Sequence, residues 1–105
     1  MAFRVSQTEE VDRELESILL WLESEQAGDS GLRWFRRLSQ ALASLSELPQ
    51  RCPIAPESAD LPIEVRQLIF GKKPHFYRIL FTIESDTVTV LHVRHGKRSR
   101  RIDIA

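Results

Sequence analysis

The side chains that could do chemistry lie mostly in the second half of the chain. Basic side chains and one histidine run through three β-prone segments and continue just beyond them: Arg66, Arg78, Arg94, His95, Lys97 and Arg98. A guanidinium binds phosphate through two hydrogen bonds without titrating, so it can stabilise the phosphorane formed in RNA cleavage. An imidazole can protonate a leaving 5′ oxygen at neutral pH. The series predicts either an RNA-cleaving site, or arginines that pair with acidic helices of the same protein or with an acidic partner.

The sequence gives little support for a metal site, a catalytic nucleophile or a cofactor-binding site. His92 and His95 fall on opposite faces of a predicted strand, and no Asp, Glu or Cys lies close enough in sequence to complete a metal site. His75 follows a proline at a strand start, as a solvated edge residue would. Cys52 has no neighbouring His that would activate its thiol. Motifs of the GxSxG, HExxH, P-loop and GxGxxG types are absent, so we expect no metal and no cofactor.

The distribution of charge indicates where a partner binds. The chain has 15 basic and 15 acidic side chains, but residues 1–62 hold six basic and eleven acidic groups, and residues 63–105 hold nine and four. The C-terminal part is therefore a basic surface that suits an anionic partner. The zero net charge argues against strong non-specific binding to nucleic acid.

Length and cysteine content indicate a small cytoplasmic protein. A chain of 105 residues with 42% hydrophobic side chains can bury one core, so residues 1–105 are expected to form one domain. The single cysteine fits a reducing compartment. No apolar run is long enough to cross a membrane and the N-terminus lacks a signal peptide, so we expect a cytoplasmic location without membrane contact.

Two amphipathic helices are predicted to precede the basic region. After a short β-prone start at residues 3–6, Ser6 and Glu9 have the spacing of a capping box, and apolar residues recur at helical spacing as far as Leu22. Residues 24–30 read as a turn. Asp29 or Ser30 can cap a second helix, whose leucine stripe ends at Pro49. The pattern predicts an antiparallel helical hairpin.

Three strands are predicted after a proline-rich crossing. They cover Ile63–Phe70, His75–Ile83 and Thr87–Val93, and their short connections make neighbours antiparallel. The order is β-α-α-β-β-β, an α+β fold with the hairpin packed on a small, mainly antiparallel sheet. The expected core brings helical leucines against strand residues: Leu15, Leu19, Leu38, Leu42 and Leu45 against Ile79, Phe81 and Val90. The cationic groups Arg78, Arg94, His95, Lys97 and Arg98 are expected to gather at one end of the sheet.

Four short motifs, in the expected order, carry a resemblance to a known family. They are Leu45-x-x-Leu48-Pro49, Val65-Arg66-x-Leu68, Tyr77-Arg78-Ile79-Leu80-Phe81 and Val90-Leu91-His92-Val93-Arg94-His95-Gly96-Lys97-Arg98. Along nearly its whole length the chain resembles toxins of the RelE/ParE superfamily, the toxin half of bacterial type II toxin–antitoxin pairs, also called plasmid stabilisation proteins.

The resemblance implies two mechanisms. RelE-like members cut mRNA in the ribosomal A site, and ParE-like members poison DNA gyrase. Here Arg66, Arg78, His95 and Arg98 would form the nuclease site, but no Tyr follows Arg98, where the nucleases commonly have one. The His95–Arg98 ending is nearer to the ParE-like branch, which favours a gyrase-directed inhibitor. For a gyrase-directed inhibitor, the predicted target-binding residues are Arg78, Arg94, His95, Lys97 and Arg98.

The resemblance also implies a partner. Antitoxins of this group are disordered, acidic and amphipathic chains that fold on the toxin. Trp21 and Trp34 are the predicted antitoxin anchors, since Trp34 is flanked by arginines and lies off the main apolar stripe. A third reading, a non-toxic interaction module on the same fold, stays open.

Overall fold

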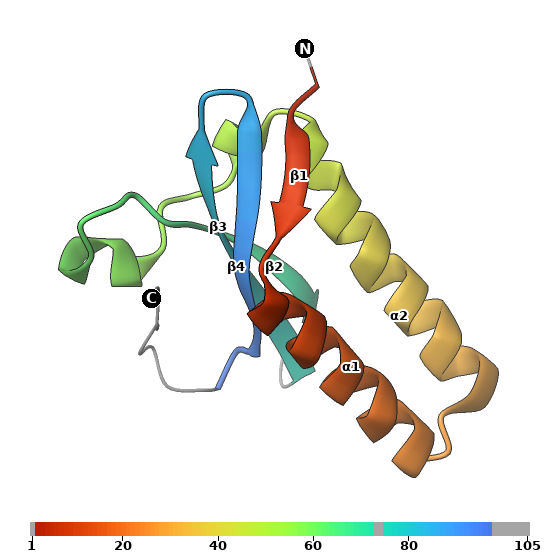
Figure 1. Ribbon diagram of the computed structural model, residues 1–105. Coiled ribbons are helices and arrows are strands. Elements are labelled where there is room, and N and C mark those ends of the chain that lie inside the picture. Colours follow the sequence, from red (N-terminus) through yellow and green to blue (C-terminus); the bar gives the residue numbers. More distant parts are fainter. Residues whose placement is uncertain (1, 73–74, 98–105) are drawn as a thin grey trace.

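The computed structural model describes residues 2–72 and 75–97. Strand β1 (Arg4–Gln7) leads into helices α1 (Glu9–Ser24) and α2 (Gly28–Ala43). Three short 3₁₀ turns follow: η1 (Ser44–Ser46), η2 (Pro49–Arg51) and η3 (Pro56–Asp60). Strands β2 (Arg66–Lys72), β3 (His75–Glu84) and β4 (Thr87–His95) complete the order (Figure 1). The predicted β-α-α-β-β-β order is confirmed.

The sheet has four strands in the order β1-β4-β3-β2. Strands β2, β3 and β4 pair antiparallel, whereas β1 pairs parallel with β4, with Val5 opposite Val88. The helical hairpin and the proline-rich segment carry the chain from β1 at one edge to β2 at the other, and β3 and β4 then return, so that the last strand lies beside the first. The sheet is thus mainly antiparallel, as predicted.

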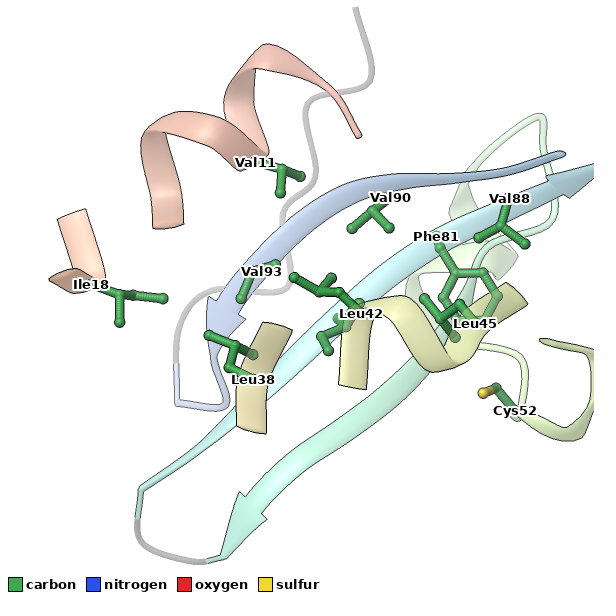
Figure 2. Packing of buried hydrophobic residues seen from close by; sticks show 11 residues of the cluster. Val11, Ile18, Leu38, Leu42, Leu45, Cys52, Phe81, Val88, Val90 and Val93 are labelled. Atoms are coloured by element: carbon green, nitrogen blue, oxygen red, sulfur yellow. The ribbon is translucent and has the colours of Figure 1, made fainter. Parts of the chain in front are cut away.

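The helical hairpin covers one face of this sheet, and the main core lies between them (Figures 1 and 2). Of the predicted core, Leu38, Leu42, Leu45, Ile79, Phe81 and Val90 are buried. In α1, however, Val11 and Ile18 are the buried residues, and Leu15 and Leu19 are only half-buried. The predicted stripe is therefore rotated slightly about the helix axis.

The proline-rich segment covers the other face of the sheet. Ala55 and Val65 pack there on Leu80, and Leu61 and Leu91 flank them. Ile54 bridges to Arg66, and the Gln67 N–H donates to the Pro53 carbonyl, so this segment also protects the start of the edge strand β2. The sheet consequently has a helical face and a loop-covered face.

Several predicted boundaries are wrong for local reasons. Thr8 caps α1, because its hydroxyl accepts from the Val11 N–H at 3.3 Å, whereas Ser6 lies within β1. Helix α2 begins at Gly28 without a side-chain cap, so Asp29 and Ser30 already belong to its first turn.

The second helix and the first predicted β-segment also end or begin elsewhere. Helix α2 ends at Ala43, because η1 follows and Leu48 then adopts a left-handed backbone with φ 45° and an exposed side chain. Strand β2 begins at Arg66, three residues after the predicted start at Ile63. In the described residues, no helix is both long and apolar enough to span a bilayer.

Shortening Leu42 to Ala tests the core. This side chain is 7% exposed between α2 and the sheet, so its truncation should lower the free energy of unfolding by about 2–5 kcal/mol. The matched control is Leu48→Ala, since Leu48 is 71% exposed and should change stability by less than about 0.5 kcal/mol. Urea titration followed by circular dichroism measures both. Equal losses in the two variants would contradict this packing.

Candidate functional site

The end of the β3–β4 ladder brings four aromatic or imidazole rings together. Tyr77 pairs with His95 in the ladder, and their ring centroids lie 5.4 Å apart. His75 and Phe76 place their rings 6.2 and 6.4 Å from that of His95. Because Tyr77 is partly buried, its pKa is raised and its phenol stays protonated. His75 is exposed, as the sequence interpretation of a solvated residue expects, but that interpretation misses this cluster, which depends on strand register.

His95 is held by the turn that follows β4. The Lys97 N–H donates to His95 Nδ1 at 3.2 Å, so Nδ1 is an acceptor and the ring proton belongs to Nε2. Gly96 makes this turn possible, because a Cβ there would lie 2.0 Å from the Phe76 ring. The Gly96 N–H also donates to the Phe76 carbonyl at 2.8 Å. The arrangement makes His95 a hydrogen-bond donor through Nε2–H.

A largely apolar cavity of about 540 Å³ opens between this end of the sheet and the tip of the hairpin. It is lined by Trp21, Leu22, Ala27, Ser30, Gly31, Trp34, His75, Tyr77 and His95. Trp34 packs edge-on against Phe70 and Tyr77, with centroids 5.4 and 5.6 Å apart. Trp21 forms the outer wall and is 50% exposed. We call this the aromatic cavity.

The two tryptophans therefore differ in setting. Trp34 is half-buried and packs against the main core, so the expectation that it lies off the apolar surface is wrong. Trp34 is covered by Phe70 and Tyr77 of the sheet, and the helical periodicity of α2 alone does not predict these contacts. Trp21 remains accessible. Both tryptophans line the same cavity as His95. The predicted antitoxin anchors and one predicted target-binding residue therefore share one site.

Glu14 fastens the end of β4 to α1. Its carboxylate accepts the Val93 N–H at 2.8 Å and lies 3.2 Å from His92 Nδ1 and 3.9 Å from Arg94 Nε. Strand β1 pairs with β4 only as far as Val90, so Glu14 satisfies an edge amide beyond that point. Sequence reasoning missed Glu14, because it lies among the acidic residues off the apolar stripe and its contact spans 79 residues.

Arg78 lies at the same end of the sheet, where it pairs with Arg94 in the ladder, but its side chain is on the loop-covered face. It makes two 2.6 Å hydrogen bonds to the Glu57 carboxylate in η3. It also donates to Gln67 at 2.7 and 3.0 Å. Arg78 and Glu57 are 8% and 6% exposed. The expectation that Arg78 gathers with His95 is thus corrected, because alternation along β3 sends Arg78 and Tyr77 to opposite faces.

The other two strand arginines also have partners within the protein. Arg66 donates to the carbonyls of Cys52 and Gln50 at 2.7 and 3.2 Å and lies 3.2 Å from Glu64. Its guanidinium ties the proline-rich segment to β2. Arg94 is mostly covered beside Glu14. This geometry agrees with the alternative in which the arginines pair with acidic groups of their own protein.

The predicted target-binding set is therefore divided. His95 and Lys97 lie together beside the aromatic cavity, with Lys97 exposed. Arg78 is on the opposite face. Arg98 lies outside the described residues, so its role stays a prediction.

Comparisons with known proteins agree with the architecture. The sequence model of the "ParE toxin of type II toxin-antitoxin system, parDE" matches residues 5–100. Because the match covers most of the chain, this protein belongs to the ParE toxin family. A solved structure described as the "Chromosomal ParDE TA system from P. aeruginosa" contains a similar chain, with a TM-score of 0.69 and 12% identity. The similarity covers 90% of this chain and 96% of that one, and it shows a shared fold. No curated protein matches the sequence.

Replacing Arg78 by Met tests its structural role. The change leaves the Glu57 carboxylate buried without its guanidinium, and should lower the free energy of unfolding by about 3–5 kcal/mol. The double variant Arg78→Met with Glu57→Leu removes both charges and should recover most of that loss. Urea unfolding of the three proteins measures the effect. Full stability of the single variant would show that the pair is dispensable and reopen a functional role for Arg78.

Proposed function

We propose that this chain is a growth-inhibiting toxin that acts by binding DNA gyrase through the end of the sheet around His95 and Lys97. The observation that carries the proposal is the engagement of Arg78 by Glu57 and Gln67 on the far face. A phosphate-binding nuclease site would need that guanidinium in the open. Membership of the ParE family and the resemblance of the C-terminal motif to ParE-like toxins support gyrase as the target.

The chemistry of His95 supports binding rather than cleavage. A general acid must hold a proton that it can release to the leaving oxygen. In His95 the Lys97 N–H donates to Nδ1, so this ring nitrogen is already engaged within the protein and Nε2 is the one left for a partner. An imidazole held in this way can make one directed hydrogen bond through Nε2. It suits recognition of an acceptor group on a protein surface.

Charge placement supports a protein target with acidic groups. Lys97 is exposed next to His95, and the chain continues into Arg98, Arg100 and Arg101. Cations that follow one another in sequence raise the association rate with an acidic surface. The apolar wall of the aromatic cavity beside them offers a place for a buried anchor, which is how protein interfaces gain most of their affinity.

We propose further that the antitoxin occupies the aromatic cavity. An amphipathic segment can place an apolar side chain between Trp21 and Trp34, while its acidic groups lie near His95 and Lys97. Trp21 is the better anchor of the two, because it is half exposed and can lose most of that exposure on binding.

Alanine substitutions separate the two mechanisms. Induced expression of the wild type should stop growth, and His95→Ala or Arg98→Ala should relieve the arrest. The matched control is Arg4→Ala, which removes a positive charge from an exposed site on β1. Loss of supercoiling and an SOS response with intact mRNA are the expected readouts. Cleavage of mRNA in the ribosomal A site would instead select the nuclease mechanism, and growth arrest unchanged in both variants would exclude this site.

Replacing Trp21 by Ala tests the antitoxin proposal. Loss of this anchor should weaken the toxin–antitoxin complex by about 30-fold, the effect typical of a hot-spot aromatic residue. Isothermal titration with the product of the neighbouring antitoxin gene measures the change. Leu48→Ala serves as the control, since it removes an exposed apolar side chain far along the sequence from the cavity. Unchanged affinity for the Trp21 variant would place the antitoxin elsewhere.

A further inference from the structure

The helical hairpin has a second surface, on the side away from the sheet. Ile18 in α1 and Leu38 in α2 are buried against the core. Residues two positions before and after them point roughly the opposite way, because each step turns the helix by about 100°. These residues, with the exposed Leu32, make up what we call the outer hairpin face: Glu16, Leu20, Leu32, Arg36 and Gln40.

The outer hairpin face is apolar near the turn and charged farther away. Leu20 and Leu32 are 58% and 59% exposed, which is unusual for two leucines on neighbouring helices. One helical turn farther from the tip, α1 carries Glu16 and α2 carries Arg36. Counted from Gln26 in the connecting turn, both leucines are six residues away and both charges are ten residues away. The two helices are thus matched in level, and they differ in the sign of the charge.

The acidic and basic sides extend beyond this pair. The described exposed side chains of α1 include Glu9, Glu10 and Asp12, with one arginine, Arg13, that pairs with its own glutamates. The exposed basic side chains of α2 are Arg33, Arg36 and Arg37. The exposed charges are thus mainly acidic on α1 and mainly basic on α2, and these two helices lie side by side (Figure 1).

We propose that a second copy of this chain docks on the outer hairpin face, related by a two-fold axis parallel to the hairpin. Such an axis places α1 of one copy over α2 of the other, at the same level along the hairpin. Leu20 then meets Leu32, Glu16 meets Arg36, and both contacts occur twice, as an isologous interface requires. A two-fold axis perpendicular to the helices would instead place α1 on α1 and oppose like charges.

The two leucines and the two charges contribute to association in different ways. Burial of the leucines supplies the apolar driving force, and the charge pairs select the orientation. A chain with 15 basic and 15 acidic side chains also has no net repulsion between copies. The interface lies on the far side of the helices from the sheet, so it does not depend on the function proposed above.

Charge reversal tests this interface in the full-length chain. Sedimentation velocity should show a monomer–dimer equilibrium between micromolar and about 1 mM protein. Glu16→Arg alone and Arg36→Glu alone should each weaken the dimer about tenfold or more, because each opposes two pairs of like charges. An equal mixture of the two variants should restore it, since both cross-contacts are again between Arg and Glu. The control is Glu47→Arg, an exposed reversal outside the hairpin.

Three results would overturn the proposal. The first is a wild type that stays monomeric over this range. The second is a dimer that neither reversal weakens, or a weakened dimer that the mixture of variants does not restore. Circular dichroism checks that each variant is folded. The third is a monomeric chain in which Arg36→Glu weakens the antitoxin complex, because the face would then belong to the antitoxin.

Discussion

The buried ion pair between Arg78 and Glu57 determines which surface of the sheet can function. Two charges are kept out of water there, and such a pair is tolerated only when nearly all of its hydrogen-bonding groups have partners. Gln67 supplies the remaining acceptor, so the guanidinium is bound from two directions. The pair holds η3 against the sheet and closes that face. The function proposed above accordingly uses the helical side, where the aromatic cavity lies.

The position of His95 depends on contacts that begin far away in the sequence. Parallel pairing of β1 with β4 brings the start of α1 beside the last strand, and Glu14 then binds the Val93 amide where β1 has ended. Two residues later, His95 stands opposite Tyr77, and the turn at Gly96 presents its Nε2–H. The hairpin tip adds Trp21 and Trp34. One cavity thus combines an apolar wall with donors at its rim, an arrangement that suits binding to a protein.

The fold was largely predictable, and the site only in part. Periodicity identified the helices and strands, because Leu38, Leu42 and Phe81 follow patterns that burial imposes. Register was enough to place His95 near β3. Which face each arginine occupies was not predictable, since the partner of Arg78 comes from a proline-rich segment that has no periodicity. The cap of α1 was missed for a similar reason: Ser6 has the spacing of a capping box, but it pairs within β1, which leaves Thr8 as the cap.

A chain that inhibits by binding gyrase, as proposed above, does not cut RNA. The most direct measurement uses purified components: the chain is added to gyrase with relaxed plasmid and, in parallel, to ribosomes carrying a defined mRNA. We expect supercoiling to be lost when the chain is roughly stoichiometric with gyrase, while the mRNA stays intact. Codon-specific cleavage of the mRNA on the ribosome, with supercoiling unaffected, would contradict it.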